Sequence, residues 1–203
     1  MHFPAPPQRD AASTHRWLRA VLCCALCSLA CTPKEAAEPG LTKVPHFPLE
    51  LAIPDGWVLD SSDLTEDPAK GGSVLKLVRK SQVTGSPRID FSLSPLTTAP
   101  QKLEAVARLA SGQMTRLQQQ SQFTPQGNSE RKVTFAGHPA IRLEQSYTLG
   151  SNSTEVAVAQ FSIVTVINER GLIITSAGRR ELFTPLASEL ETLLKNVKAT
   201  PTP

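Results

Sequence analysis

Two long apolar runs in the C-terminal third of the chain limit its possible folds most strongly. One extends from about Val156 to Ile167, and Leu172-Ile173-Ile174-Thr175 follows after the turn sequence Asn168-Glu169-Arg170-Gly171. Runs rich in β-branched residues on either side of a short turn are typical of a β-hairpin. Because the two runs can pair over most of their length, we expect this hairpin at the centre of a sheet.

Shorter runs with a period of two predict further strands, since alternate side chains of a strand point to opposite faces of its sheet. A strand, a tight turn at Pro54-Asp55-Gly56 and another strand are expected around Trp57, and a hairpin is expected at Gly137-His138-Pro139. In this hairpin Arg142 and Glu144 should face away from the core. The alternating or continuous apolar residues are Phe47, Leu49, Leu51 and Ile53; Val74 to Val78; Ile89, Phe91 and Leu93; Val133 and Phe135; and Ile141, Leu143 and Tyr147.

Two segments change to helical spacing. The first should begin with a capping box formed by Thr98 and Gln101, and the second with Thr184 as N-cap and Pro185 at the first helical position. Their apolar residues are Leu103, Val106 or Ala107, Ala110, Met114 and Leu117 in the first, and Leu186, Leu190, Leu193, Leu194 and Val197 in the second. The sequence therefore predicts an α+β fold, an antiparallel β-sheet with two long helices packed on it.

The N-terminal segment has the layout of a signal peptide. Arg16 and Arg19 precede an uncharged apolar run from Ala20 to Ala30, which is too short to span a bilayer. We therefore expect residues 1–30 to be a signal peptide, 31–45 a lipid-anchored tether, 46–198 a single domain and 199–203 a disordered tail. All four cysteines lie between positions 23 and 31, which argues against a disulfide framework and against a zinc site in the domain.

Cys31 follows Ser28-Leu29-Ala30 and precedes the polar sequence Thr32-Pro33-Lys34. This arrangement resembles the bacterial lipobox, although Ser28 stands where that motif usually has Leu. The resemblance implies acylation of Cys31, a cell-envelope location, and, because Thr32 is not Asp, the outer membrane in preference to the inner. Ordinary signal cleavage that leaves Cys31 free is the alternative.

The composition offers little support for catalysis or nucleic-acid binding. Three of the 21 basic and one of the 18 acidic residues lie in the leader, so the remainder carries 18 basic against 17 acidic residues. Two histidines, His46 and His138, remain in the domain, and neither has a nucleophile or a metal partner near it in sequence. We therefore expect no catalytic residue, no metal site and no cofactor.

Several other patterns have plain structural interpretations. We expect a solvated acidic loop rather than a calcium site, a turn, exposed basic pairs, aromatic residues that fill the core rather than line a ligand cleft, and a chance glycosylation triplet. The acidic loop holds Asp60, Asp63, Glu66 and Asp67, and the turn is Gly71-Gly72-Ser73. The basic pairs are Arg131-Lys132 and Arg179-Arg180, and the triplet is Asn152-Ser153-Thr154. The aromatic residues are Trp57, Phe91, Tyr147 and Phe161.

The order of elements resembles the PsbP-like, DcrB-like and LpqN-like group of envelope proteins. The resembling pieces are the stretch from Phe47 to Trp57, the turn Ala136-Gly137-His138-Pro139-Ala140, and the stretch from Gln160 to Leu194. The resemblance implies an α/β/α sandwich and members that act as accessory or assembly factors, with no shared catalytic motif.

We therefore expect a membrane-anchored, non-catalytic binding or assembly-accessory module. Its partners would be the bilayer, through acylated Cys31, and another envelope protein or a small apolar ligand. An envelope hydrolase or transferase whose site is hidden in the sequence is one alternative, and a secretion-chaperone-like protein is another. An enzyme should show a pocket of convergent titratable groups, whereas a binding module should show an apolar groove or an exposed strand edge.

Overall fold

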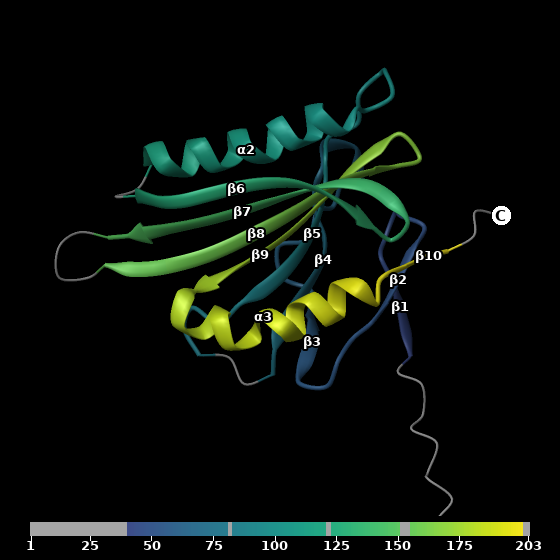
Figure 1. Ribbon diagram of the computed structural model, residues 1–203. Coiled ribbons are helices and arrows are strands. Elements are labelled where there is room, and N and C mark those ends of the chain that lie inside the picture. The colour runs from purple at the N-terminus through teal and green to yellow at the C-terminus, as the bar shows by residue number, and fades with distance from the viewer. Residues whose placement is uncertain (1–39, 81–82, 121–122, 151–154, 201–203) are drawn as a thin grey trace, which may run out of the picture. The chain divides into compact units, whose positions relative to one another are not determined.

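The computed structural model describes residues 40–80, 83–120, 123–150 and 155–200. Ten strands, two α-helices and one short 3-10 helix form in these ranges (Figure 1). In chain order they are β1 (Leu41–Lys43), β2 (Leu49–Ala52), β3 (Trp57–Asp60), η1 (Pro68–Lys70), β4 (Gly72–Arg79), β5 (Arg88–Leu93), α2 (Leu103–Gln120), β6 (Phe123–Phe135), β7 (His138–Leu149), β8 (Val156–Ile167), β9 (Arg170–Arg179), α3 (Arg180–Lys195) and β10 (Lys198–Ala199).

The large sheet has seven strands in the order β3-β4-β5-β9-β8-β7-β6, and every neighbouring pair is antiparallel. The predicted hairpin is confirmed as β8 and β9, which lie in the middle of this order. Its turn is formed by Asn168 and Glu169, both with positive φ (49° and 63°), as a tight two-residue hairpin turn requires. A second, three-stranded sheet has the order β1-β2-β10.

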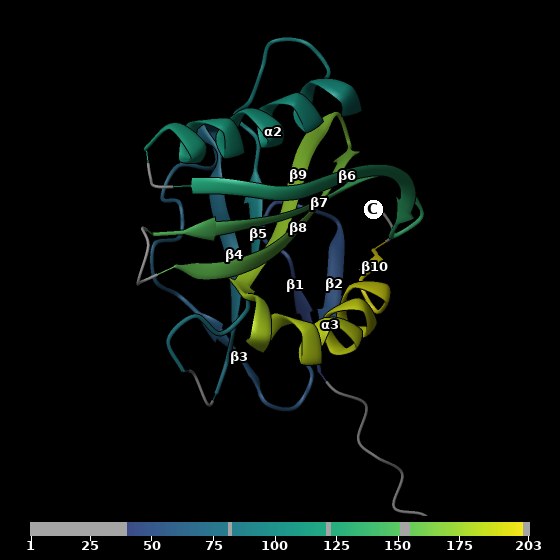
Figure 2. The same ribbon diagram turned by 60° about the vertical axis from the view of Figure 1, so that its left-hand side comes forward.

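The large sheet is the middle layer between the two helices, with α2 on one face and α3 on the other (Figures 1 and 2). The two faces carry separate apolar clusters. Ile173 packs toward Val106 of α2, whereas its neighbour Ile174 belongs to the cluster that contains Leu190 of α3. Burial on both faces explains why β8 and β9 are almost continuously apolar rather than alternating. The predicted α+β class is confirmed.

Four local predictions need correction. The first helix begins at Leu103 and not at a capping box, because Gln101 is used elsewhere: its Oε1 accepts from the amide of Gly171 at 2.5 Å and its Nε2 donates to the carbonyl of Pro95 at 2.5 Å. A Cβ on Gly171 would lie 2.6 Å from the Ser94 hydroxyl, so only glycine allows this close approach.

The last helix begins at Arg180, and Pro185 lies inside it. Pro185 is only the sixth residue of the helix, so the single backbone hydrogen bond that it cannot donate lies near the helix start.

The boundaries of the tether and the tail also differ from the prediction. β1 lies inside the stretch 31–45 and pairs with β2, because Val44 is buried (1% exposed) and fixes this segment to the core. At the other end Ala199 pairs with Leu49, and the amide of Thr200 donates to Pro48. The sequence could not reveal either contact, because β1 and β10 are only three and two residues long.

The strands on either side of the Pro54-Asp55-Gly56 turn are present, but they belong to different sheets: β2 to the small one and β3 to the edge of the large one. The turn itself is confirmed by the bond from the Trp57 amide to the Pro54 carbonyl (3.1 Å) and by Gly56 at φ 86°.

Candidate functional site

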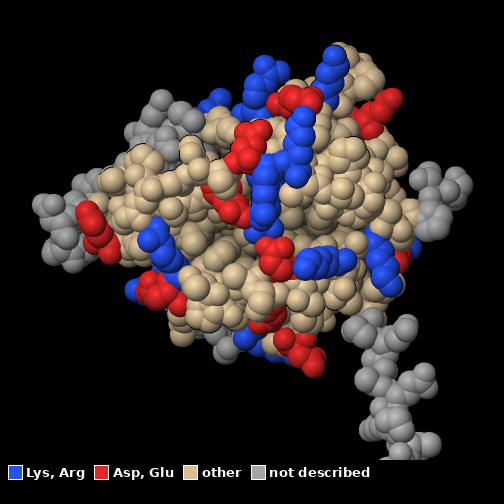
Figure 3. Space-filling model, in the orientation of Figure 1, with Lys and Arg blue, Asp and Glu red and all other residues tan. Residues whose placement is uncertain are grey.

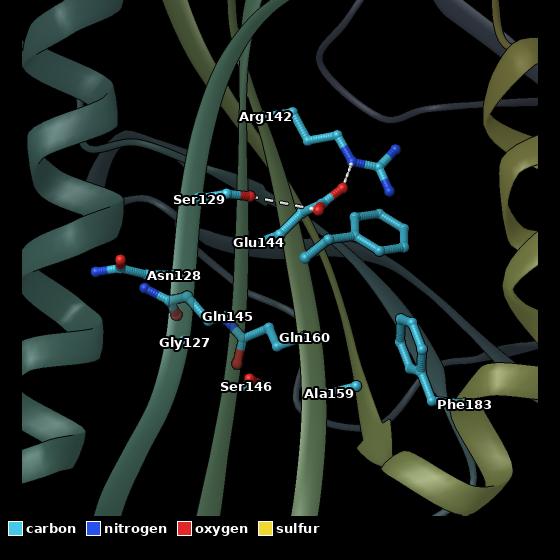
Figure 4. Close-up of a pocket in the computed structure, with 11 residues that line it drawn as sticks. Gly127, Asn128, Ser129, Arg142, Glu144, Gln145, Ser146, Ala159, Gln160 and Phe183 are labelled. Atoms are coloured by element: carbon cyan, nitrogen blue, oxygen red, sulfur yellow. Dashed lines mark hydrogen bonds and ion pairs between the residues drawn. The ribbon is translucent and has the colours of Figure 1, made fainter.

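A hollow of 460 Å³ opens on the α3 side of the large sheet, where β6, β7 and β8 extend past the N-terminal end of α3 (Figure 4). Strand alternation explains its lining. On β7, Ile141 and Leu143 point toward α2, so Arg142, Glu144 and Ser146 point to the opposite face. The other lining residues are Gly127, Asn128 and Ser129 of β6, Gln145 of β7, Ala159, Gln160 and Phe161 of β8, and Phe183 of α3.

Arg142 is the central charged side chain of this hollow, and only 12% of the side chain is exposed. Its Nε donates to Glu144 at 2.7 Å and its Nη1 to Glu191 of α3 at 2.5 Å. The guanidinium also lies over the ring of Phe161, 4.6 Å from the ring centre. The expectation that Arg142 faces away from the core was therefore incomplete, because α3 covers the face to which this side chain points.

Glu144 also forms an ion pair with a second arginine, because Nη2 of Arg131 lies 3.0 Å from the same carboxylate oxygen. Partial burial acts to raise the pKa of Glu144, but the positive charges of Arg142 and Arg131, with hydrogen bonds from Arg142 and Ser129, outweigh it and lower that pKa. The carboxylate is therefore ionised and paired near neutral pH, which does not suit a general acid. Figure 3 shows the resulting band of mixed positive and negative side chains across this face.

The floor of the hollow is aromatic. Phe161 and Phe183 meet edge to face, with ring centres 5.9 Å apart and planes at 76°. Phe161 thus belongs to the core and also lines the hollow. The other three aromatic residues are buried as expected: Phe91 is fully enclosed, Tyr147 donates its hydroxyl to Gln160, and Trp57 is 2% exposed.

Trp57 belongs to a second cluster of polar contacts, which connects α3 to the sheet. Its indole Nε1 and Nη1 of Arg79 both donate to Oε1 of Glu189 at 2.5 Å, and the Arg79 guanidinium lies 5.6 Å from the ring centre of Trp57. Glu189 and Glu191 therefore connect the same helix to arginines on two different strands, β4 and β7. This explains why α3 keeps its position beside the hollow.

β6 forms the free edge of the large sheet next to this hollow. It pairs with β7 along its whole length and is the last strand in the sheet order, and residues 124–132 are all exposed. Pro125 and a bulge between Pro125 and Gly127 interrupt its first part, where Arg180 of α3 also donates to Gln126. From Asn128 onward the pairing with β7 is regular.

The two histidines are not brought together with a nucleophile. His46 is exposed at φ 66° between β1 and β2, and His138 is the first residue of β7, in the hairpin turn. In the part of the chain that the structure describes, neither histidine side chain has a hydrogen bond or an ion pair, and no three His, Cys, Asp or Glu side chains gather as metal ligands.

The acidic loop uses its carboxylates locally. Asp60 accepts from the Ser62 amide, which lowers the pKa of Asp60, Asp63 pairs with Lys76 at 3.7 Å, and Asp67 caps η1 by accepting from Ala69. The interpretation as a solvated loop is therefore supported.

The remaining sequence candidates are also accounted for, except those outside the described ranges. Gly71 ends η1 as part of a turn, Arg131 pairs with Glu144, and Arg179 pairs with Glu181 at 2.6 Å. Cys31 and Asn152-Ser153-Thr154 lie outside the described residues. Sequence reasoning missed Phe183 and Glu191 as neighbours of the hollow, because helical spacing shows which face is apolar and not which strand a helix crosses.

No helix in the described ranges is long and apolar enough to cross a membrane. A scan against protein-family models and a search of curated proteins each gave no match. Among solved structures, cyanobacterial PsbP (CyanoP) from Synechocystis sp. PCC 6803 is similar to this chain with a TM-score of 0.54 and 14% identity, over 84% of this chain and 97% of that one.

A second solved structure, LpqN of Mycobacterium tuberculosis, which is involved in cell envelope biogenesis, has a TM-score of 0.49 and 19% identity over 82% of this chain and 88% of that one. At these identities the likeness concerns the fold alone, and CyanoP is matched over almost its full length. With its seven-stranded antiparallel sheet between two helices, this chain has a PsbP-like fold.

Proposed function

We propose that this protein is an exported lipoprotein of a bacterial envelope, anchored through Cys31, that acts as a non-catalytic binding or assembly-accessory module for another envelope protein. The observation that carries the binding role is the free edge of β6 beside the hollow. The lipobox-like sequence at Cys31 supports the anchor, and the weak preference for the outer membrane follows from Thr32.

An exposed strand edge is a binding site for an extended peptide, because its unpaired N–H and C=O groups accept one more strand. In an antiparallel strand, alternate residues turn these groups away from the existing neighbour. The stretch from Asn128 to Thr134 has no proline and pairs regularly with β7, so its outer side can extend the sheet. A strand added there would place every second side chain toward the hollow floored by Phe161 and Phe183.

The charged residues on this edge favour binding of a selective partner over unspecific aggregation. Glu130, Arg131 and Lys132 follow one another in its middle, and charged residues on a free edge disfavour random strand pairing. Against an enzymatic role, Glu144 is held ionised by two arginines, and Arg142 is occupied by two glutamates. This ionic network orders the hollow and pairs the charges of Arg142 and Glu144 with each other and with Arg131 and Glu191.

The test is photo-crosslinking in intact membranes. A photoreactive amino acid at Asn128 should give a discrete crosslinked band, and the same residue at Leu59 should not. Leu59 is the matched control because it is exposed (52%) and lies on β3, the opposite edge of the same sheet. Equal crosslinking at both positions, or none at Asn128 with normal protein level, would contradict the edge as the binding site.

A small apolar ligand is a second candidate, supported by a different hollow of 480 Å³ at the start of α2. Pro95, Pro100, Ala105 and Leu109 line it, and its lining is mainly apolar. An environment-sensitive apolar dye should gain fluorescence on binding, and Leu109→Asp should abolish that gain while leaving the crosslink at Asn128 intact. An unchanged dye signal in the variant would remove this candidate.

A further inference from the structure

The small sheet β1-β2-β10 has an outer face that borders a second groove, between α3 and strands β6 and β7, in which Lys195 and Lys198 lie beside Arg131 and Glu191. Leu49 and Leu51 of β2 are fully buried, so the alternate residue Glu50 points outward. The register places Lys43 of β1 and Lys198 of β10 on either side of Glu50, on the same face. This face therefore carries two lysines around one glutamate.

Two further residues extend this basic surface. Lys195, in the last turn of α3, is exposed and precedes Lys198 by three residues, and Leu41 at the start of β1 is 52% exposed. Within the described ranges none of the three lysines has an ion pair, unlike Arg79, Arg131 and Arg142 on the large sheet. Glu50 opposes them, and so does Glu191, which lines the same groove as Lys195 and Lys198 but is paired with Arg142. The surface therefore has a net positive charge and can bind an external anion.

The length of chain between the proposed anchor and β1 limits how the domain can be oriented at the membrane. Nine peptide units separate Cys31 from Gly40, the first described residue, and a chain of that length reaches at most about 30 Å. A domain of this size is roughly 40 Å across. Figures 1 and 2 both show α2 on the opposite side of the large sheet from the start of β1. A lipid on Cys31 would thus hold the small sheet near the bilayer and leave α2 on the far side.

We propose that the outer face of the small sheet, with Lys43, Lys195 and Lys198 around the exposed Leu41, rests on the anionic headgroups of the bilayer that anchors the chain. This inference rests on the proposed lipid anchor. It also assigns an orientation: the apolar hollow beside Leu109 faces away from the membrane. Basic side chains close to an anionic surface each add to membrane affinity, so the three lysines together favour the docked orientation on the order of 100-fold.

The experiment uses the full chain, purified from membranes and reconstituted in vesicles of phosphatidylcholine with or without phosphatidylglycerol. No cysteine follows Cys31, so Asn196→Cys, between Lys195 and Lys198, and Gln113→Cys, exposed on α2, each give a single site in the domain for a fluorescent dye. Quenching by headgroup-labelled lipid should be strong for the dye at position 196 and weak at position 113. The contrast should require phosphatidylglycerol and decrease in about 0.5 M salt, where charges are screened within a few ångströms.

Variants separate docking from mere proximity. Lys43→Gln/Lys195→Gln/Lys198→Gln should abolish the phosphatidylglycerol-dependent quenching. Lys102→Gln/Arg108→Gln/Arg116→Gln removes the same charge from α2 and the residue before it, and should leave the quenching unchanged. Equal quenching at both dye positions, or quenching that the lysine variant does not reduce, overturns the docking surface. Failure of the wild-type chain to float with vesicles is a different outcome, because it overturns the lipid anchor on which the inference rests.

Discussion

Replacing Leu190 by aspartate should unfold the domain, because this side chain is the centre of the contact between α3 and the large sheet. Leu190 is 0% exposed and belongs to the apolar cluster that contains Phe91, Leu172 and Ile174. Truncating a buried leucine to alanine already costs about 2–5 kcal/mol through lost burial and the cavity left behind. A carboxylate in the same place adds several kcal/mol for an unpaired buried charge. Since domains are stable by only about 5–15 kcal/mol, the sum removes most or all of the stability.

The assay is thermal unfolding followed by circular dichroism, with two comparison variants. Leu190→Ala should remain folded and melt roughly 5–20 °C lower, since 1 kcal/mol shifts the melting point of a domain of this size by about 2–4 °C. Ser188→Asp places the same charge on the exposed side of the same helix and should melt within a few degrees of wild type. A cooperative transition of Leu190→Asp near the wild-type temperature, or an equal loss in Ser188→Asp, would refute the packing of α3 on this sheet.

Three further predictions concern the anchor, catalysis and acid stability. Cys31→Ser should incorporate no labelled palmitate while wild type does, and equal label in both would refute the anchor. His46→Ala/His138→Ala should complement a deletion phenotype at wild-type abundance, and failure to do so would favour the hydrolase alternative. Glu144→Gln should destabilise the domain to urea at pH 7. Because the folded-state pKa of Glu144 is lowered from 4.5, its contribution is present above that value and is lost as the pH falls through the folded pKa, so the difference from wild type should shrink as the pH is lowered below 4.5. A difference that stays constant with pH would contradict the ionic role.

Local pattern determined most of the fold. The alternation of Ile89, Phe91 and Leu93 with polar residues reproduces β5, and the apolar run from Val156 to Ile167 matches β8. The helical spacing after Leu103 matches α2. These elements are predictable because the period of the apolar residues follows directly from strand and helix geometry.

The element boundaries depended on tertiary contacts. Gln101 does not cap α2 because it bonds to Gly171, 70 residues away in sequence, and β1 forms only because β2 lies beside it. A segment of three residues has no period to detect, and a polar side chain chooses its partner only after folding brings candidates together. Sequence therefore predicted the existence of the elements better than their ends.

The candidate site was decided almost entirely by tertiary structure. Arg142 and Glu144 were visible as polar residues on one face of a strand, but nothing in their spacing shows that Glu191 of α3 and Phe161 of β8 would enclose the guanidinium. The bond from Trp57 to Glu189 joins residues 132 positions apart. The sequence determined which faces are apolar, because that follows from the local period; only the crossing of α3 over the sheet, set by packing of the whole core, decided which charges meet.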